Sequence, residues 1–221
     1  MGINGLLLNL RSISRKQHIS VFAGQKVAID GYSWLHRALH LCGVDVAVHN
    51  DLGKIVSYFE KKIAYFLSVN MKVTLVFDGD KLPLKISTET SRLQNRQKCH
   101  ASAMELFEKG KFEDANKLFT QAIDISPAMA CFVKTQLESI FGERLTFLVA
   151  PYEADSQLAY LSKVGLADII VTEDSDLLVF GAARMFYKLD KDFNGFEVSL
   201  SRLNECAEFS FDGWSHDKFI F

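Results

Sequence analysis

The stretch Lys26-Val-Ala-Ile-Asp30 decides the fold, because a short apolar run without polar alternation is typical of a strand buried on both faces of a parallel sheet. Helical patterns, at residues 55–69 and 155–164 among others, separate most of the runs of this kind. Strands that alternate with helices predict an α/β fold, with a central twisted parallel sheet flanked by helices. The other expected strands are Val73-Thr-Leu-Val-Phe-Asp78, Leu145-Thr-Phe-Leu-Val149, Asp168-Ile-Ile-Val-Thr172 and Met185-Phe-Tyr-Lys-Leu189.

Residues 81–136 form a long insertion between the second and third expected strands. The insertion is polar at first and helical in pattern later, and it is much longer than a simple crossover requires. We interpret it as a helical arch at the edge of the sheet. Residues 110–127 resemble half of a tetratricopeptide repeat, but a repeat solenoid needs about three repeats, so a local helical hairpin is the better interpretation.

Composition indicates one packed domain. The chain has 221 residues, 48% of them hydrophobic, and a formal net charge of −2. We expect a single domain over residues 1–221. No apolar run is long enough to cross a membrane, and we expect a monomer with no membrane partner. The cysteines show no CxxC pairing, which argues against a zinc site or a disulfide framework; they are Cys42, Cys99, Cys131 and Cys206.

Acidic residues follow the expected strands at their carboxyl ends, which meet on one rim of an open parallel sheet. Any one of them could simply cap a helix. Together they would repel one another, by about 4 kcal/mol for a pair ~4 Å apart at an effective dielectric near ~20, unless cations lay between them. These residues are Asp30, Asp78, Glu153, Asp155, Glu173, Asp174 and Asp176.

Such a group of carboxylates predicts a site for hard divalent cations. Oxygen ligands favour Mg²⁺, or Mn²⁺ in its place, over zinc. Two such ions about 3.5–4 Å apart can stabilise both the attacking and the leaving oxygen at a phosphodiester. The sequence contains no P-loop and no Ser/His/Asp arrangement that would compete for the chemistry.

Basic residues gather at the start of the insertion, although the chain as a whole is nearly neutral. Between residues 81 and 98 the only acid is Glu89. Arg92 and Arg96 are four residues apart and would share one helix face. A phosphate-binding surface and a merely solvated helix face explain this pattern equally well. The basic residues are Lys81, Lys85, Arg92, Arg96 and Lys98.

Five blocks of this sequence are recognisable as a set. They are Met1-Gly-Ile-Asn-Gly-Leu6, Ala28-Ile-Asp30-Gly-Tyr-Ser-Trp-Leu-His36, Leu75-Val-Phe-Asp78-Gly79, Val149-Ala-Pro-Tyr-Glu153-Ala-Asp155-Ser-Gln-Leu-Ala-Tyr160 and Thr172-Glu-Asp174-Ser-Asp176-Leu-Leu178. In this order and spacing they resemble the flap endonuclease and exonuclease 1 family of structure-specific 5′ nucleases, with its PIN-like 5′ nuclease fold. The resemblance runs over the whole chain, and it is strongest to exonuclease 1.

The resemblance implies roles for individual residues. The metal-binding acids would be Asp30, Asp78, Glu153, Asp155, Asp174 and Asp176. Lys85 and Arg92 would join them in catalysis and, with Arg96, would steer the scissile phosphate onto two Mg²⁺ ions. Gly2 would lie near the substrate, Tyr32 would stack on the scissile nucleotide, and His36 would contact a phosphate.

The implied activity is that of a Mg²⁺-dependent 5′ to 3′ double-stranded DNA exonuclease, with 5′ flap endonuclease activity as a second capacity. It would act in the nucleus, in mismatch repair and end resection, on duplex DNA with a free or flapped 5′ end. The family has a further metal-binding aspartate and a duplex-gripping helical motif beyond a segment like His216-Asp-Lys-Phe-Ile-Phe221. We therefore expect this chain to be incomplete at its C-terminus.

Two alternatives remain open. A catalytically incompetent fragment or paralogue could serve as a DNA- or protein-binding module. A haloacid-dehalogenase-like phosphatase could use Asp174-Ser-Asp176, but its motif favours Thr or Val where Leu178 stands and normally follows the first strand. Preference for exonuclease or flap substrates, the metal used in the cell and the identity of repair partners cannot be read from the sequence.

Overall fold

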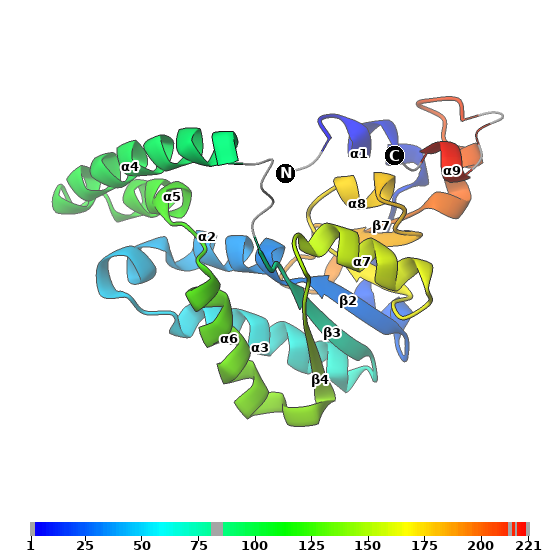
Figure 1. Ribbon diagram of the computed structural model, residues 1–221, viewed down its shortest axis with the longest axis horizontal. Coiled ribbons are helices and arrows are strands. Elements are labelled where there is room, and N and C mark those ends of the chain that lie inside the picture. Colours follow the sequence, from blue (N-terminus) through cyan, green and yellow to red (C-terminus); the bar gives the residue numbers. More distant parts are fainter. Residues whose placement is uncertain (1–2, 81–85, 212–213, 215, 220–221) are drawn as a thin grey trace. The chain divides into compact units, whose positions relative to one another are not determined.

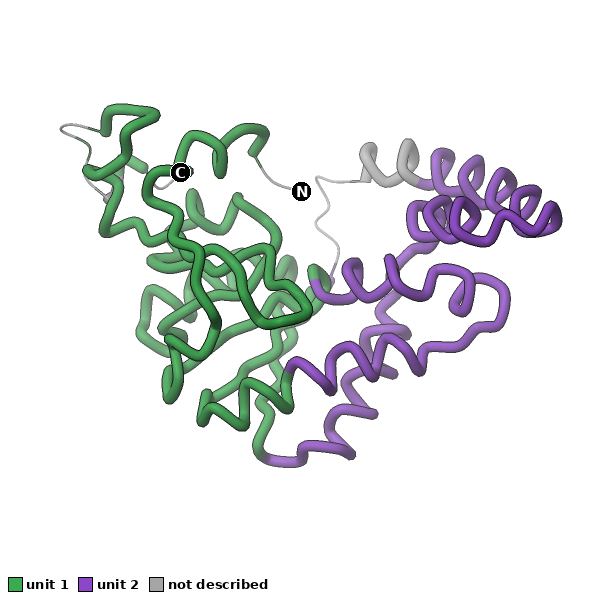
Figure 2. The backbone as a smooth tube through the Cα atoms, turned by 180° about the vertical axis from the view of Figure 1, so that it is seen from behind, with its two compact units in different colours: residues 1–33, 63–79, 144–221 green, residues 34–62, 80–143 purple. Residues whose placement is uncertain are grey.

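The computed structural model describes residues 3–80, 86–211, 214 and 216–219. The chain divides into two compact units, coloured separately in Figure 2. The first unit comprises residues 1–33, 63–79 and 144–221, and the second comprises residues 34–62 and 80–143. Each unit is described by itself.

The first unit is built on a seven-stranded sheet in the order β1-β7-β6-β5-β2-β3-β4. Strands β6, β5, β2, β3 and β4 run parallel, and at one edge β7 pairs antiparallel with both of its neighbours, β6 and β1. The bounds are β1 Arg15–His18, β2 Lys26–Asp30, β3 Lys72–Phe77, β4 Leu145–Val149, β5 Ile169–Val171, β6 Arg184–Tyr187 and β7 Asn194–Ser199.

The five strands expected from the sequence are all present and parallel, with bounds that differ by at most two residues. The expectation of a purely parallel sheet was incomplete, because β1 and β7 make the sheet mixed. Strand β1 consists of four polar residues at the sheet edge, where charged side chains discourage pairing with other chains. Such a strand has no apolar run by which to recognise it.

Helices and turns cover the sheet of the first unit. Helix α7 (Ala154–Lys163) lies beside β2 and β3 (Figure 1) and buries Leu158 and Leu161. Helix α8 (Asp176–Val179) follows β5 and buries Leu177 and Leu178 in the same core. Short helices α1 (Leu6–Asn9) and α9 (His216–Phe219) lie near the chain ends. The loops that carry the acids follow the parallel strands at their carboxyl ends.

The second unit is helical. It contains most of α2 (Gly31–His49), the first part of α3 (Gly53–Ser68), and helices α4 (Ile86–Glu108), α5 (Phe112–Ala122) and α6 (Pro127–Phe141). Helices α4 and α5 lie side by side as a hairpin (Figure 1), and Ala103, Ala115 and Phe119 form their buried centre. Ser126 is the N-cap of helix α6, and its hydroxyl accepts a hydrogen bond from the Met129 N–H. Three helices thus occupy most of the insertion predicted at residues 81–136.

In the described part of the chain, no helix combines the length and the apolar character needed to span a bilayer.

Candidate functional site

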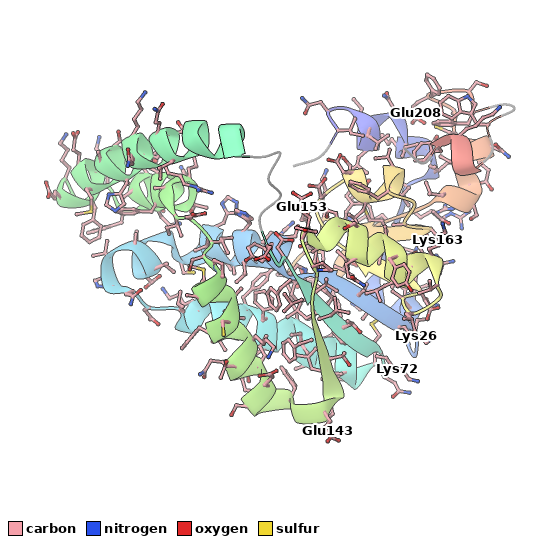
Figure 3. The ribbon with its side chains drawn as sticks, in the orientation of Figure 1. Lys26, Lys72, Glu143, Glu153, Lys163 and Glu208 are labelled. Atoms are coloured by element: carbon pink, nitrogen blue, oxygen red, sulfur yellow. The ribbon has the colours of Figure 1, made fainter. Side chains whose placement is uncertain are left out.

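The carboxyl ends of the parallel strands carry the acids that the sequence singles out. Asp30 is the last residue of β2, and Asp78 follows β3 directly. Glu153 is the N-cap of α7, with Asp155 in its first turn. Asp174 lies between β5 and α8, and Asp176 is the first residue of α8. Figure 3 shows Glu153 at this end of the sheet, and Lys26 and Lys72 at the opposite end of β2 and β3.

Asp30 is the most deeply placed of these acids, with 7% of its surface exposed. One carboxylate oxygen accepts the Ser33 N–H at 3.0 Å, and the other accepts the Thr172 hydroxyl at 2.9 Å. Burial raises the pKa of Asp30 to about 6 against these two bonds, and the charges of Asp78 and Asp174 add to the rise. The carboxylate is therefore fixed in direction by two hydrogen bonds, while burial and two like charges disfavour its ionised form.

Asp155 shows that the acids converge. The pKa of its carboxyl is raised to about 8, first by burial and then by the charges of four neighbouring acids: Asp30, Asp174, Asp78 and Glu153. Each of these four residues comes from a different loop or strand end of the first unit. The structure therefore brings four of the predicted metal ligands near enough to Asp155 for their charges to disfavour its ionised form.

The loop after β3 is fitted against the loop after β4. The Gly79 N–H donates to the Tyr152 carbonyl at 2.6 Å, and Asp78 accepts the Ala154 N–H at 2.6 Å. A Cβ at Gly79 would lie 2.0 Å from the Ala150 carbonyl oxygen. Only glycine fits at this close approach, so residue 79 fixes how near Asp78 comes to the start of α7.

The sixth acid, Asp176, follows Asp174 in a tight turn. The Asp176 N–H donates to the Asp174 carboxylate at 3.0 Å. The Oδ1 atom of Asp176 is buried and has no hydrogen-bond partner among the described residues. A buried carboxylate oxygen without a donor is costly unless a cation or a proton compensates it.

The donor set of this rim fits a divalent cation. It consists of carboxylate oxygens, including the unpartnered Oδ1 of Asp176, and hard oxygen ligands are those preferred by Mg²⁺ and Mn²⁺. The four acids lie near enough to Asp155 to affect its pKa, but among the described residues no group of three or more His, Cys, Asp or Glu side chains is arranged so that it could hold a metal ion as it stands.

Sequence reasoning missed the residues that hold the acids in place. Thr172 is 1% exposed; its hydroxyl donates to Asp30 and also accepts the Asp174 N–H at 3.1 Å. Ser33 donates its N–H to Asp30, and its hydroxyl accepts the Glu173 N–H at 3.1 Å. A buried hydroxyl residue between two acids at a strand end was the available signal for Thr172. Hydrogen bonds of this kind orient ligands around metal sites.

The residues predicted to contact DNA are only partly described. Gly2 and Lys85 lie outside the described residues, and Arg92 falls in α4 at a point where only the backbone is described. The ring of Tyr32 is half-buried and meets Phe77 edge to face, with ring centroids 6.2 Å apart.

His36 and Arg96 belong to the second unit, where both are half-buried. An Arg96 guanidinium nitrogen lies 2.9 Å from a carboxylate oxygen of Asp124. Burial lowers the pKa of His36, and the nearby His40 and Arg96 lower it further, so the ring is neutral at pH 7. Arg96 is thus paired with Asp124, a partner that the sequence pattern did not predict.

Two protein-family descriptions match this chain. Residues 1–99 match the XPG N-terminal domain, and residues 144–221 match the XPG I-region. The predicted metal-binding acids fall inside these two matches, and residues 100–143 lie between them.

Curated relatives are similar over most of the chain. Exonuclease 1 of Danio rerio is 39% identical over 93% of this chain and 25% of its own length. Exonuclease 1 of Xenopus laevis is 37% identical over 99% of this chain and 29% of its own length. The DNA damage-inducible protein DIN7 of Saccharomyces cerevisiae is 38% identical over 94% of this chain and 48% of its own length. The chain therefore spans a quarter to a half of the length of these relatives.

Solved structures share the fold. The catalytic core of Rad2 in complex with DNA substrate matches with a TM-score of 0.66 at 21% identity, over 95% of this chain and 58% of that one. Human GEN1 in complex with Holliday junction DNA matches with a TM-score of 0.61 at 16% identity, over 98% of this chain and 47% of that one. These likenesses establish the PIN-like 5′ nuclease architecture.

Proposed function

Because the chain belongs to the flap endonuclease and exonuclease 1 family of structure-specific 5′ nucleases, we propose that it hydrolyses phosphodiesters of DNA near a 5′ end, with divalent cations as cofactors. The observation that carries this proposal is the convergence of Asp30, Asp78, Glu153 and Asp174 on Asp155, where burial and mutual repulsion raise the pKa of that carboxyl to about 8. Perturbed acids at one rim of a sheet are typical of a catalytic site.

The metal ligands in this proposal are Asp30, Asp78, Glu153, Asp155, Asp174 and Asp176, which would hold two Mg²⁺ ions, or Mn²⁺ in their place. When bound, such ions supply a nucleophilic water and neutralise charge on the phosphate. Thr172 and Ser33 would keep the Asp30 carboxylate aimed at them. The neutral His36 ring would offer a phosphate a hydrogen bond without adding charge.

The proposed DNA contacts are Gly2, Tyr32, His36, Lys85, Arg92 and Arg96. Lys85 and Arg92 would also act in catalysis by bringing the scissile phosphate to the cations. Arg96, as a fixed positive charge on α4, suits an anionic partner such as the DNA backbone. We propose that residues 81–136 act as an arch within one nuclease domain over residues 1–221. Duplex DNA with a free or flapped 5′ end is the proposed substrate.

We further propose that the chain acts in nuclear DNA repair as a 5′ to 3′ exonuclease, with flap cleavage as a second activity, and that it is a monomer. A repair role is supported by the relative DIN7, which is named as a DNA damage-inducible protein.

End-labelled blunt duplexes and 5′ flap substrates, incubated with Mg²⁺, Mn²⁺ or chelator, test the proposal. We expect cleavage from the 5′ end that chelator abolishes. Asp174→Ala should reduce the rate about 100-fold or more and leave DNA affinity largely intact, as expected for a residue that acts on the metals. Glu143→Ala, which removes an exposed acid outside the carboxylate group, serves as the control. Cleavage by Asp174→Ala at the rate of the control would refute the metal assignment.

A further inference from the structure

Helix α2 is broken near its middle. At Cys42 the backbone angles, φ −145° and ψ 27°, are not helical, and this residue joins two helical segments. In an unbroken helix, the Val44 N–H would donate to the His40 carbonyl, and the Gly43 N–H to the Leu39 carbonyl. Backbone groups at such a break require other partners when water cannot reach them.

A side chain from another helix supplies those partners. The amide oxygen of Asn116, in α5, accepts the Val44 N–H at 3.0 Å. The amide nitrogen of Asn116 donates to the His40 carbonyl at 2.9 Å. The two ends of one helical hydrogen bond are thus both bonded to one amide group. A side-chain amide has the donor and the acceptor that this insertion needs, whereas a carboxylate has only acceptors.

Thr120, one turn further along α5, lies against the same break. Its hydroxyl is 3.3 Å from the Leu39 carbonyl and 2.8 Å from the Asn116 carbonyl. Gly43 makes the close approach feasible: a Cβ there would lie 2.9 Å from the Asn116 carbonyl oxygen and 3.0 Å from the Thr120 hydroxyl. Helix α5 is therefore seated directly on the break, without intervening side chains from α2 at that point.

The seated helix α5 in turn carries α4. The buried centre of the α4–α5 hairpin also takes in Val44, Ala47 and Val48 from the second segment of α2. Arg96 lies on α4, near enough to affect the pKa of His36 on the first segment of α2. The hydrogen bonds of Asn116 thus join α2, which carries His36, to α5, which packs against α4 and its Arg96.

We propose that Asn116 is a positioning residue, which locks the α4–α5 hairpin to the break in α2 and so fixes Arg96 and its helix relative to His36. The proposal rests on the proposed function, since its consequence is the placing of a phosphate for cleavage. A displacement of about 1 Å in a catalytic arrangement can reduce turnover by about 100-fold. Loss of Asn116 should therefore lower the rate of the chemical step more than the affinity for DNA.

The test compares four single variants of the full chain. Asn116→Leu removes both hydrogen bonds at similar volume, and Asn116→Asp keeps the acceptor for Val44 but not the donor for His40. Gly43→Ala leaves every hydrogen-bonding group in place and forces the helices apart, although alanine favours a helix over glycine by about 1 kcal/mol. Glu113→Gln changes an exposed residue of α5 and is the matched control.

Single-turnover cleavage at saturating DNA, equilibrium DNA binding and hydrogen exchange of the Val44 amide are measured below the unfolding temperature of each variant. We expect Asn116→Leu and Gly43→Ala to cut about 10-fold more slowly or worse, with DNA affinity within about 3-fold of wild type. Asn116→Asp should fall between them and wild type, and Glu113→Gln should match wild type. The Val44 amide should exchange about 10-fold faster in Asn116→Leu.

The outcomes separate the two proposals. Folded Asn116→Leu and Gly43→Ala variants that cut at the wild-type rate would overturn the positioning role of Asn116, as would equal losses of rate and affinity. Should Asn116→Leu not fold, the graded effect of Asn116→Asp and the effect of Gly43→Ala decide the question. A wild-type chain that cuts neither duplex nor flap would overturn the proposed nuclease function, and Val44 exchange would still show whether Asn116 joins the two helices.

Discussion

The sheet rim of the first unit and the break in α2 of the second unit treat their polar groups in different ways. In the first unit, hydrogen bonds from Ser33 and Thr172 orient the Asp30 carboxylate, while burial and the charges of neighbouring acids raise the pKa values of Asp30 and Asp155. In the second unit, polar groups find partners: Arg96 is paired with Asp124, and the break in α2 is bridged by Asn116. Clustered acids with raised pKa values indicate a site for a cation. Polar groups that are paired with one another indicate a structural role.

The largest effect on this comparison should come from removing the close approach at the rim. Gly79→Ala places a Cβ 2.0 Å from the Ala150 carbonyl oxygen, a clash that should cost about 3 kcal/mol in the free energy of unfolding. For a chain of this size that lowers the Tm by about 6–12 °C. Thermal unfolding followed by circular dichroism measures it. Gly110→Ala is the control, because the positive φ of Gly110 also disfavours alanine but no atom lies within 4 Å of the added Cβ. An equal decrease of Tm in both variants would show that the close approach at Gly79 contributes nothing specific.

Thr172→Val should weaken the rim while preserving its shape. The variant removes the donor to Asp30 and the acceptor for the Asp174 N–H, and loss of such orienting bonds typically reduces metal affinity or activity by about 10–100-fold. A titration of cleavage rate against Mn²⁺ concentration measures this effect. Thr172→Ser, which keeps the hydroxyl, should recover most of the rate. A Thr172→Val variant with the metal dependence of wild type would contradict the orienting role of Thr172.

Asp155→Asn should stabilise the metal-free chain. The folded-state pKa of Asp155 is raised from 3.8 to about 8, so ionisation between these pH values disfavours the folded state, and stability falls as pH rises through this window. In chelator, the variant should therefore gain a few degrees in Tm over wild type at pH 8, about 2–4 °C for each kcal/mol of repulsion removed. The gain should shrink to a small remainder near pH 4, where the wild-type carboxyl is protonated in the folded state and about half ionised in the unfolded state. A constant difference across this range would contradict the electrostatic cause.

The smallest effect should come from releasing Arg96. Asp124→Asn removes the carboxylate that lies 2.9 Å from the Arg96 guanidinium. Because a partly exposed ion pair contributes about 0.2–1 kcal/mol, DNA affinity at low salt should rise by no more than about 5-fold. Asp114→Asn makes the same change of net charge beside Lys117 on α5, so fluorescence anisotropy of both variants isolates the contribution of Arg96. An equal rise in the two variants would indicate a general charge effect.

The sequence predicts the ends of the parallel strands well, because these strands are short apolar runs that end where acids begin. Lys26–Asp30 and Leu145–Val149 have the bounds that their apolar residues predict. Strand β1, with the sequence RKQH, carries no such signal, since its place is fixed by pairing with β7. The antiparallel edge of the sheet therefore required the structure.

Contacts between distant residues explain what else the sequence could not predict. The break at Cys42 lies within a helix whose sequence contains no proline, and its partner Asn116 is 72 residues from Val44 along the chain. The same holds for Thr172, whose bond to Asp30 spans 142 residues. The residue types at the rim were predictable from local pattern, but the hydrogen bonds that hold them were not.

Calorimetric titration of Mg²⁺ and Mn²⁺ into the full chain at pH 7, in buffers of different ionisation enthalpy, tests the convergence of the acids most directly. Cations bind ionised carboxylates, so binding must displace the proton that Asp155 holds at this pH, given its pKa of about 8. The account predicts saturable binding with release of up to about one proton, and loss of that release in Asp155→Asn. Saturable binding without proton release, or no binding at all, would contradict it.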